Sequence, residues 1–291
     1  MTTASEKKVK CALCGTESHQ WHLCSSNMFG SSDLDTRPPG MYRRSMEYWL
    51  QRCPNCNFVA ESLAKTTELP KDFLTTKEYL DFGDHFPKDK LIETFLFKAR
   101  ISGRIGDWQT AFWDYLAAAW VADDKDITNC YACLARITAV KASLKNITNR
   151  YACWYRLFEC LCYIFTYLKC FCWHKKDADD HNEDDADEKI DYDTDTYWIK
   201  QARLEALNAY DKIPNIKRNN MLQIVRADLL RKTEQFDRLI NEYAEVQFSE
   251  NILNQVVAFE IEKAKLKDTK TYTVADVVPA DAMPNDESFP Y

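Results

Sequence analysis

The chain contains 291 residues, a length typical of one large domain or of two ordinary ones. Hydrophobic residues make up 46% of it and aromatic residues 13%, which is enough for a substantial core and excludes a wholly disordered protein. The 6 Gly and 9 Pro residues are too few for a collagen-like or low-complexity chain, and the formal net charge of −7 argues against a general binder of polyanions.

Residues 1–10 are polar and lysine-rich, and we expect them to form a disordered lead. They contain no apolar segment of the kind found in secretory signals, so the expected location is cytoplasmic. Cysteine thiols stay reduced in that compartment, and paired cysteines there indicate metal binding rather than disulfides.

Two Cys-x-x-Cys pairs are the main feature of residues 11–65. This spacing lets one tight turn present both sulfur atoms of a pair to the same ion. Gly15 and Asn57 follow the two pairs, at positions that often need a left-handed backbone. Two pairs make a closed tetrahedral set of thiolates, which suits one structural Zn²⁺ ion. We therefore expect a zinc-ribbon-like module with four metal ligands: Cys11, Cys14, Cys53 and Cys56.

A rival ligand set has the spacing of the CCHC knuckle that binds single-stranded nucleic acid: Cys11, Cys14, His19 and Cys24. However, Ala12 replaces the usual aromatic residue, and Ser18 stands where a glycine normally permits the turn. A second alternative is that the cysteines are unrelated buried residues. We favour the two pairs, with His19, His22 and Cys24 facing solvent or packing.

The loop between the two pairs is rich in polar and charged side chains: Asn27, Asp33, Asp35, Arg37, Arg43 and Arg44. Arginine side chains of this kind can recognise a carboxylate or a phosphate. The alternative, which we favour, is an Asp–Arg network that stiffens the loop. Short apolar segments at 46–52 and 58–60 flank the second cysteine pair, and we expect them to be strands.

From about residue 70, apolar residues recur with the spacing of amphipathic helices, and short polar turns separate the segments. The expected fold class is mainly α: a small zinc-ribbon-like β module at the N-terminus, followed by an antiparallel TPR-like α-hairpin array over 70–275. Residues 276–291 are expected to form a flexible tail. The expected helices cover 90–105, 106–122, 127–146, 151–173, 198–213, 220–232, 236–246 and 250–266.

Two of the turns share a sequence pattern. Gly106, Trp108, Ala111 and Tyr115 have the spacing of the turn between helices in tetratricopeptide repeats. The same spacing recurs in a second set, in which Glu replaces Gly and Leu replaces Ala: Glu234, Phe236, Leu239 and Tyr243. Two degenerate copies predict TPR-like hairpins but not a full solenoid.

Residues 150–195 differ in character from the rest of the chain. The segment 151–173 is long enough to span a bilayer, but Arg156, Glu159 and Lys169 interrupt it, so we favour a buried or partner-facing helix over a membrane span. Residues 177–195 contain eleven acidic residues and one lysine, and we expect an acidic disordered loop over 175–195. The cysteines within the helical segments are expected to be reduced packing residues.

The sequence resembles a bacterial family of unknown function in which a paired-CxxC module leads into TPR-like helices. The resemblance is carried by Cys11, Cys14 and Gly15, residues 26–31, Asp33-Leu-Asp35, Arg37-Pro38, Met41, Arg43, Trp49 and Cys53-Pro-Asn-Cys56, with further matches at 119–124, 226–231 and 268–274. It implies zinc at the four cysteines and brings no established reaction. Residues 150–195 depart from the family and have the character of an insertion.

No phosphate-binding loop, cofactor fingerprint or His-Glu-x-x-His sequence occurs in the chain. Four thiolates also leave a zinc ion no open coordination position for catalysis. We therefore expect a non-enzymatic zinc-binding protein that acts as a protein–protein interaction scaffold, with a helical groove for another protein. The alternative is a zinc-dependent protein that binds RNA or single-stranded DNA, which the small basic surplus of residues 1–62 does not favour.

Overall fold

The computed structural model describes residues 2–82, 89–125, 194–215 and 218–278. The chain divides into two units, Met1–Asp124 with Asp193–Tyr291, and Lys125–Tyr192. The helices expected at 127–146 and 151–173 and most of the acidic loop lie outside the described residues. Among the residues that are described, no helix combines the length and the apolar character needed to cross a bilayer.

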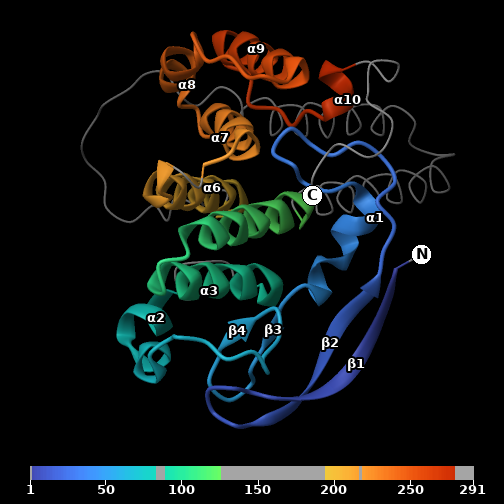
Figure 1. Ribbon diagram of the computed structural model, residues 1–291, viewed down its shortest axis with the longest axis vertical. Coiled ribbons are helices and arrows are strands. Elements are labelled where there is room, and N and C mark those ends of the chain that lie inside the picture. Colours follow the sequence, from blue (N-terminus) through green and yellow to red (C-terminus); the bar gives the residue numbers. More distant parts are fainter. Residues whose placement is uncertain (1, 83–88, 126–193, 216–217, 279–291) are drawn as a thin grey trace, which may run out of the picture. The chain divides into compact units, whose positions relative to one another are not determined.

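Two antiparallel strand pairs form the N-terminal module (Figure 1). Strand β1 (Thr3–Lys10) pairs with β2 (Glu17–Ser25), and the short strand β3 (Gln51–Arg52) pairs with β4 (Val59–Ala60). The expected disordered lead over 1–10 is therefore wrong. Residues 3–10 have no apolar alternation of their own, but β2 supplies a partner for their backbone groups, and the Lys8 ammonium lies 2.6 Å from the Glu17 carboxylate.

The segment 46–52 is a strand only at its end. Helix α1 (Gly40–Arg43) continues into the 3₁₀ helix η1 (Arg44–Tyr48), and β3 begins only at Gln51. Within η1 the Ser45 hydroxyl donates to the Tyr42 carbonyl and accepts a hydrogen bond from the Trp49 indole. The Trp49 N–H also donates to the Met46 carbonyl, at 3.2 Å, so local hydrogen bonds favour a turn here over a strand.

The second half of the module packs on the first long helix. After η2 (Lys71–Thr75) and α2 (Lys77–Phe82) comes α3 (Lys90–Arg104). Phe97 and Ile101 of α3 belong to one buried cluster with Cys11 and Cys53 of the module. Helix α3 therefore shares a hydrophobic core with the two buried cysteines.

The body of the protein is mainly α, as the sequence predicts. A helix over residues 108–125 follows α3, and Figure 1 shows the later helices in yellow to red. Asp89 and Asn219 each cap a helix by accepting backbone N–H hydrogen bonds at its first turn. The later helices are α6 (Thr194–Lys212), α7 (Asn220–Lys232), α8 (Phe236–Tyr243), α9 (Asn251–Lys265) and α10 (Val274–Val277).

The two predicted TPR-like turns have the same backbone geometry. Gly106 and Glu234 both have positive φ, 81° and 63°, directly after a helix. The next residue, Asp107 or Gln235, donates its N–H to a carbonyl five residues earlier. Lys267 ends α9 in the same way, with a φ of 53°. Because many helices end in this left-handed turn, the shared geometry does not establish a tetratricopeptide repeat.

Buried charges fix the polar loop between the cysteine pairs to the helices. Asp35 is fully buried, and its carboxylate lies 2.9 Å from the Lys232 ammonium of α7. Burial alone would raise the pKa of Asp35, but the charge and hydrogen bond of Lys232 together with the charges of Arg37 and Arg203 outweigh it and lower this pKa below its ordinary value. Arg37 pairs with Asp33 and with Asp123 of the 108–125 helix. These contacts form the Asp–Arg network expected from the sequence.

A second buried cluster surrounds Arg231 of α7, whose side chain has no exposed surface. Its guanidinium pairs with Asp228 one turn earlier and with Glu260 of α9. It also donates hydrogen bonds to the carbonyls of Asp268, at 2.9 Å, and Lys270, at 2.7 Å. The Arg231 side chain therefore connects α7 to α9 and to the segment that follows α9.

Asp114, on the 108–125 helix, is expected to make stability depend on pH. Its burial raises its pKa to about 7, although the Lys98 ammonium lies only 3.4 Å away. The folded protein then holds a proton that the unfolded chain releases above pH ~4. The free energy of unfolding should therefore fall as the pH rises towards 7. The ionisation of Asp114 should lower it by about 2–3 kcal/mol between pH 5 and pH 8.

Urea unfolding of the wild type and of Asp114→Asn at pH 5 and pH 8 measures this contribution. The variant is expected to lose that part of the pH dependence, because its amide does not ionise. Equal pH dependence in the two proteins would contradict the assignment.

Candidate metal centre

The two Cys-x-x-Cys turns have matching backbones. In each turn the first cysteine donates its N–H to the carbonyl five residues ahead, and the residue four ahead donates back to the cysteine carbonyl. That fourth residue has positive φ, 74° at Gly15 and 57° at Asn57. The four hydrogen bonds join Cys11 to Thr16, Gly15 to Cys11, Cys53 to Phe58 and Asn57 to Cys53, at 2.9, 2.9, 2.8 and 3.1 Å.

The first turn is the tip of the β1–β2 hairpin and the second is the tip of the β3–β4 hairpin, and the four sulfur atoms meet between them. All four Sγ atoms lie within 4.8 Å of one another. Two of the contacts cross from one hairpin to the other: Cys14 to Cys53 at 3.5 Å and Cys11 to Cys56 at 3.8 Å. Zinc–sulfur bonds of about 2.3 Å place the sulfurs of a tetrahedral site about 3.8 Å apart. The cluster therefore has the dimensions needed to hold a metal ion.

Burial opposes ionisation of thiols in the cluster. Cys53 is fully buried and Cys11 nearly so, whereas Cys14 is exposed. Burial raises the pKa of the Cys11 thiol, although the backbone N–H groups of Cys14 and Leu13 bond to its sulfur and favour the thiolate. Hydrogen bonding with the Thr16 hydroxyl lowers the pKa of Cys14 to about 6. A divalent cation at the centre would stabilise the thiolates on the buried side of the cluster.

No protein family, curated protein or solved structure matches this chain. The resemblance noted from the sequence therefore rests on the four-cysteine cluster and the helical body, both of which the structure contains.

The residues of the rival ligand set do not join the cluster. Within the described part of the chain, Cys11, Cys14, Cys53 and Cys56 are the one group of three or more candidate ligands close enough to hold an ion. His19 lies on β2 with its ring 3.6 Å from the Glu6 carboxylate, and Cys24 is exposed near the far end of the same strand. Neither is placed to replace a cysteine of the second pair.

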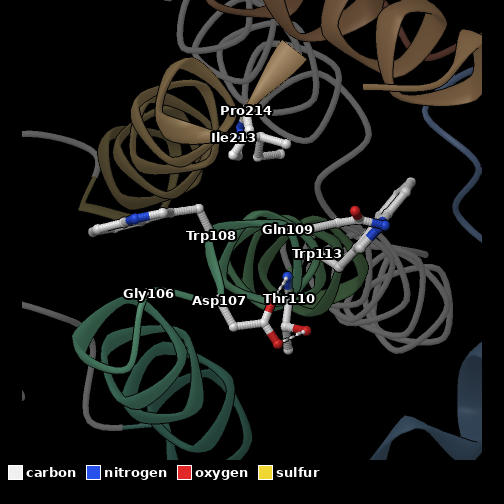
Figure 2. Close-up of a pocket in the computed structure, with 8 residues that line it drawn as sticks. All are labelled: Gly106, Asp107, Trp108, Gln109, Thr110, Trp113, Ile213 and Pro214. Atoms are coloured by element: carbon white, nitrogen blue, oxygen red, sulfur yellow. Dashed lines mark hydrogen bonds between the residues drawn. The ribbon is translucent and has the colours of Figure 1, made fainter. Parts of the chain in front are cut away.

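A notch of about 250 Å³ lies where the 108–125 helix begins beside the end of α6. Figure 2 shows Trp108 and Trp113 on its two sides, with Ile213 and Pro214 across from them. The Asp107 carboxylate within it accepts hydrogen bonds from the Thr110 N–H and hydroxyl, which caps the helix. The Asp107 carboxylate thus stabilises the start of the helix, and the cysteine cluster remains the better candidate site.

The left-handed backbone at Gly15 leads to a prediction about metal affinity. Gly15→Ala is expected to weaken zinc binding about tenfold, because a non-glycine residue in this conformation costs roughly 1–2 kcal/mol and about 1.4 kcal/mol corresponds to a factor of ten. The nearest atom to an added Cβ is 3.8 Å away, so the cost arises from the backbone rather than from a clash.

Competition with a chromophoric chelator measures this affinity. Gly40→Ala is the matched control, since Gly40 is helical and an added Cβ there meets no atom within 4 Å. An unchanged affinity in Gly15→Ala would contradict the role given to this turn.

Proposed function

We propose that this chain is a non-enzymatic zinc-binding protein that serves as a protein–protein interaction scaffold. The observation that carries the zinc assignment is the meeting of four sulfur atoms, two from each hairpin, at separations that match a tetrahedral ZnS₄ site. A closed set of four thiolates favours Zn²⁺ over the harder ions Mg²⁺ and Ca²⁺, and it leaves no coordination position for a substrate.

Metal analysis of the freshly purified protein tests the zinc assignment. We expect one tightly held zinc ion at the four cysteines, which a strong chelator removes. Replacement by Co²⁺ should give the intense charge-transfer absorption of a four-thiolate site. Protein purified without chelators that contains no zinc and takes up none would contradict the proposal.

The scaffold part of the proposal rests on rigidity and on exposed apolar side chains. The buried charge network holds the N-terminal module firmly to the helices, which fixes any surface the two share. Large apolar residues such as Phe29 and Trp21 nevertheless remain exposed, at 73% and 50%. Exposed aromatic side chains of this size can serve as anchors for a protein partner.

Cross-linking in native cells followed by mass spectrometry tests the scaffold role. We expect a reproducible protein partner that is retained by the wild type and lost when Trp21 and Phe29 are both replaced by Ser, a change that leaves the four cysteines in place. Recovery of RNA or single-stranded DNA instead, with retention that falls steeply as salt is raised, would favour nucleic-acid binding.

A further inference from the structure

A second group of metal-binding side chains lies on β2, away from the four-cysteine cluster. The His22 Nε2 atom is 3.8 Å from the Cys24 Sγ atom. The two residues are two positions apart on one strand, and both side chains contact the Ser5 hydroxyl although the register of the hairpin shifts beside Cys24. The Ser5 hydroxyl, from the residue paired with His22 on β1, lies 3.1 Å from the same ring nitrogen and 3.3 Å from the sulfur. Nitrogen, sulfur and oxygen donors thus converge on one point.

The separation of the two stronger donors suits a zinc ion. Zinc–sulfur and zinc–nitrogen bonds of about 2.3 and 2.1 Å place these atoms about 3.6 Å apart in a tetrahedral site. The observed 3.8 Å is close enough for a small rotation of either side chain to close the gap. Cys24 is exposed, so an ion can reach the pair from solvent and keep water in its remaining positions.

Strand pairing and a side-chain hydrogen bond position the two donors before any ion binds. Pairing between β1 and β2 continues on both sides of His22, from Ala4–Leu23 to Lys10–Glu17, and the register shifts beside Cys24, whose thiol donates to the Ser5 hydroxyl. Beyond Cys24, the hydroxyls of Thr3 and Ser25 hydrogen-bond to each other at 2.6 Å and close the open end of the hairpin. Donors that are already positioned by strand pairing, as at His22, or by a hydrogen bond, as at Cys24, lose less freedom when they bind an ion, which favours binding.

The donors around His22 and Cys24 lie too far from the four-cysteine cluster to bind the same ion. In the register of the hairpin, Cys24 lies beside the start of β1, whereas Cys11 follows its end. Seven residues of extended chain separate the two levels, or about 24 Å at about 3.4 Å per residue. One ion therefore cannot be shared between the two groups.

We propose that His22 and Cys24 form a second, solvent-accessible zinc site, with the Ser5 hydroxyl beside the bound ion. Two strong protein ligands hold zinc more weakly than four thiolates do, so the site fills only at higher free zinc. It is an exchangeable site, in contrast to the structural ion expected between the hairpins.

Zinc titration of the full chain against a competing chelator tests the proposal. We expect the wild type to bind one more zinc ion than Cys24→Ser or His22→Ala in the micromolar range, while all three retain the tight ion. His19→Ala is the matched control, since it removes a histidine of the same strand whose ring lies beside Glu6, and it should keep the wild-type stoichiometry. Because the chain contains further cysteines and histidines, the result is the difference between the variants.

Cobalt provides an independent readout. The weaker Co²⁺ equivalent of the wild type should show a thiolate charge-transfer band that Cys24→Ser lacks. Equal stoichiometry in the wild type, Cys24→Ser and His22→Ala would overturn the second site, and so would loss of the ion in His19→Ala. Failure of the four-cysteine site is recognised separately, by absence of the tight ion from all of the proteins.

Discussion

Cys53→Ser is expected to lose the tightly bound zinc ion and to unfold residues 11–62, with most of the helical signal kept. Cys53 is fully buried, and its sulfur is 3.5 Å from that of Cys14 on the other hairpin. The β3–β4 pair is only two residues long on each side, so it cannot hold its own turn without the ion. Structural zinc sites contribute about 10–16 kcal/mol of apparent binding free energy, which makes this the largest effect predicted here.

Metal content, hydrogen exchange and far-ultraviolet circular dichroism together measure this result. Exchange should become fast in the module and stay slow in α7 and α9. Cys24→Ser is the control, because Cys24 is exposed and outside the cluster, and it should retain the tight ion and the protected module. If Cys53→Ser bound zinc as tightly as the wild type, the four-thiolate assignment would be wrong.

Arg231→Met is expected to destabilise the protein by about 3–5 kcal/mol. The substitution removes the ion-pair partner of the buried Glu260 carboxylate, leaves Asp228 with Lys232 alone, and removes the donor to two backbone carbonyls. Breaking a buried ion pair on one side costs more than the pair contributes, because the remaining charge stays in a poorly solvated position.

Arg238→Met is the matched control for this prediction. Arg238 also pairs with two carboxylates, those of Glu242 and Asp211, but its side chain is 38% exposed. Exposed pairs contribute about 0–1 kcal/mol, so this variant should unfold at nearly the wild-type urea concentration. Similar losses in the two variants would show that burial does not set the cost.

The helices could be predicted from the sequence because their signals are local. Asn219 directly precedes α7 and accepts the Leu222 N–H, and the apolar spacing continues to Lys232, where the helix ends. The four cysteines were also predictable, since each pair carries its own turn. The structure brings the two pairs together across 38 intervening residues, as their chemistry requires.

Contacts between distant segments could not be predicted in the same way. Strand β1 depends on its register with β2, which its own residues do not indicate. The CCHC spacing associates Cys24 with His19, but in the structure the Cys24 sulfur lies beside the His22 ring, at 3.8 Å. The Lys232 partner of Asp35 and the Glu260 partner of Arg231 lie on other elements, and their residues do not indicate from the sequence alone that they will be buried together.

The pair formed by Asp35 and Lys232 joins positions 197 residues apart. During synthesis, residues 11–62 leave the ribosome long before Lys232 does, so Asp35 lacks this partner while the early segment is first exposed. We expect the four cysteines to be able to gather early and the Asp35–Lys232 pair to form last, once α7 has emerged.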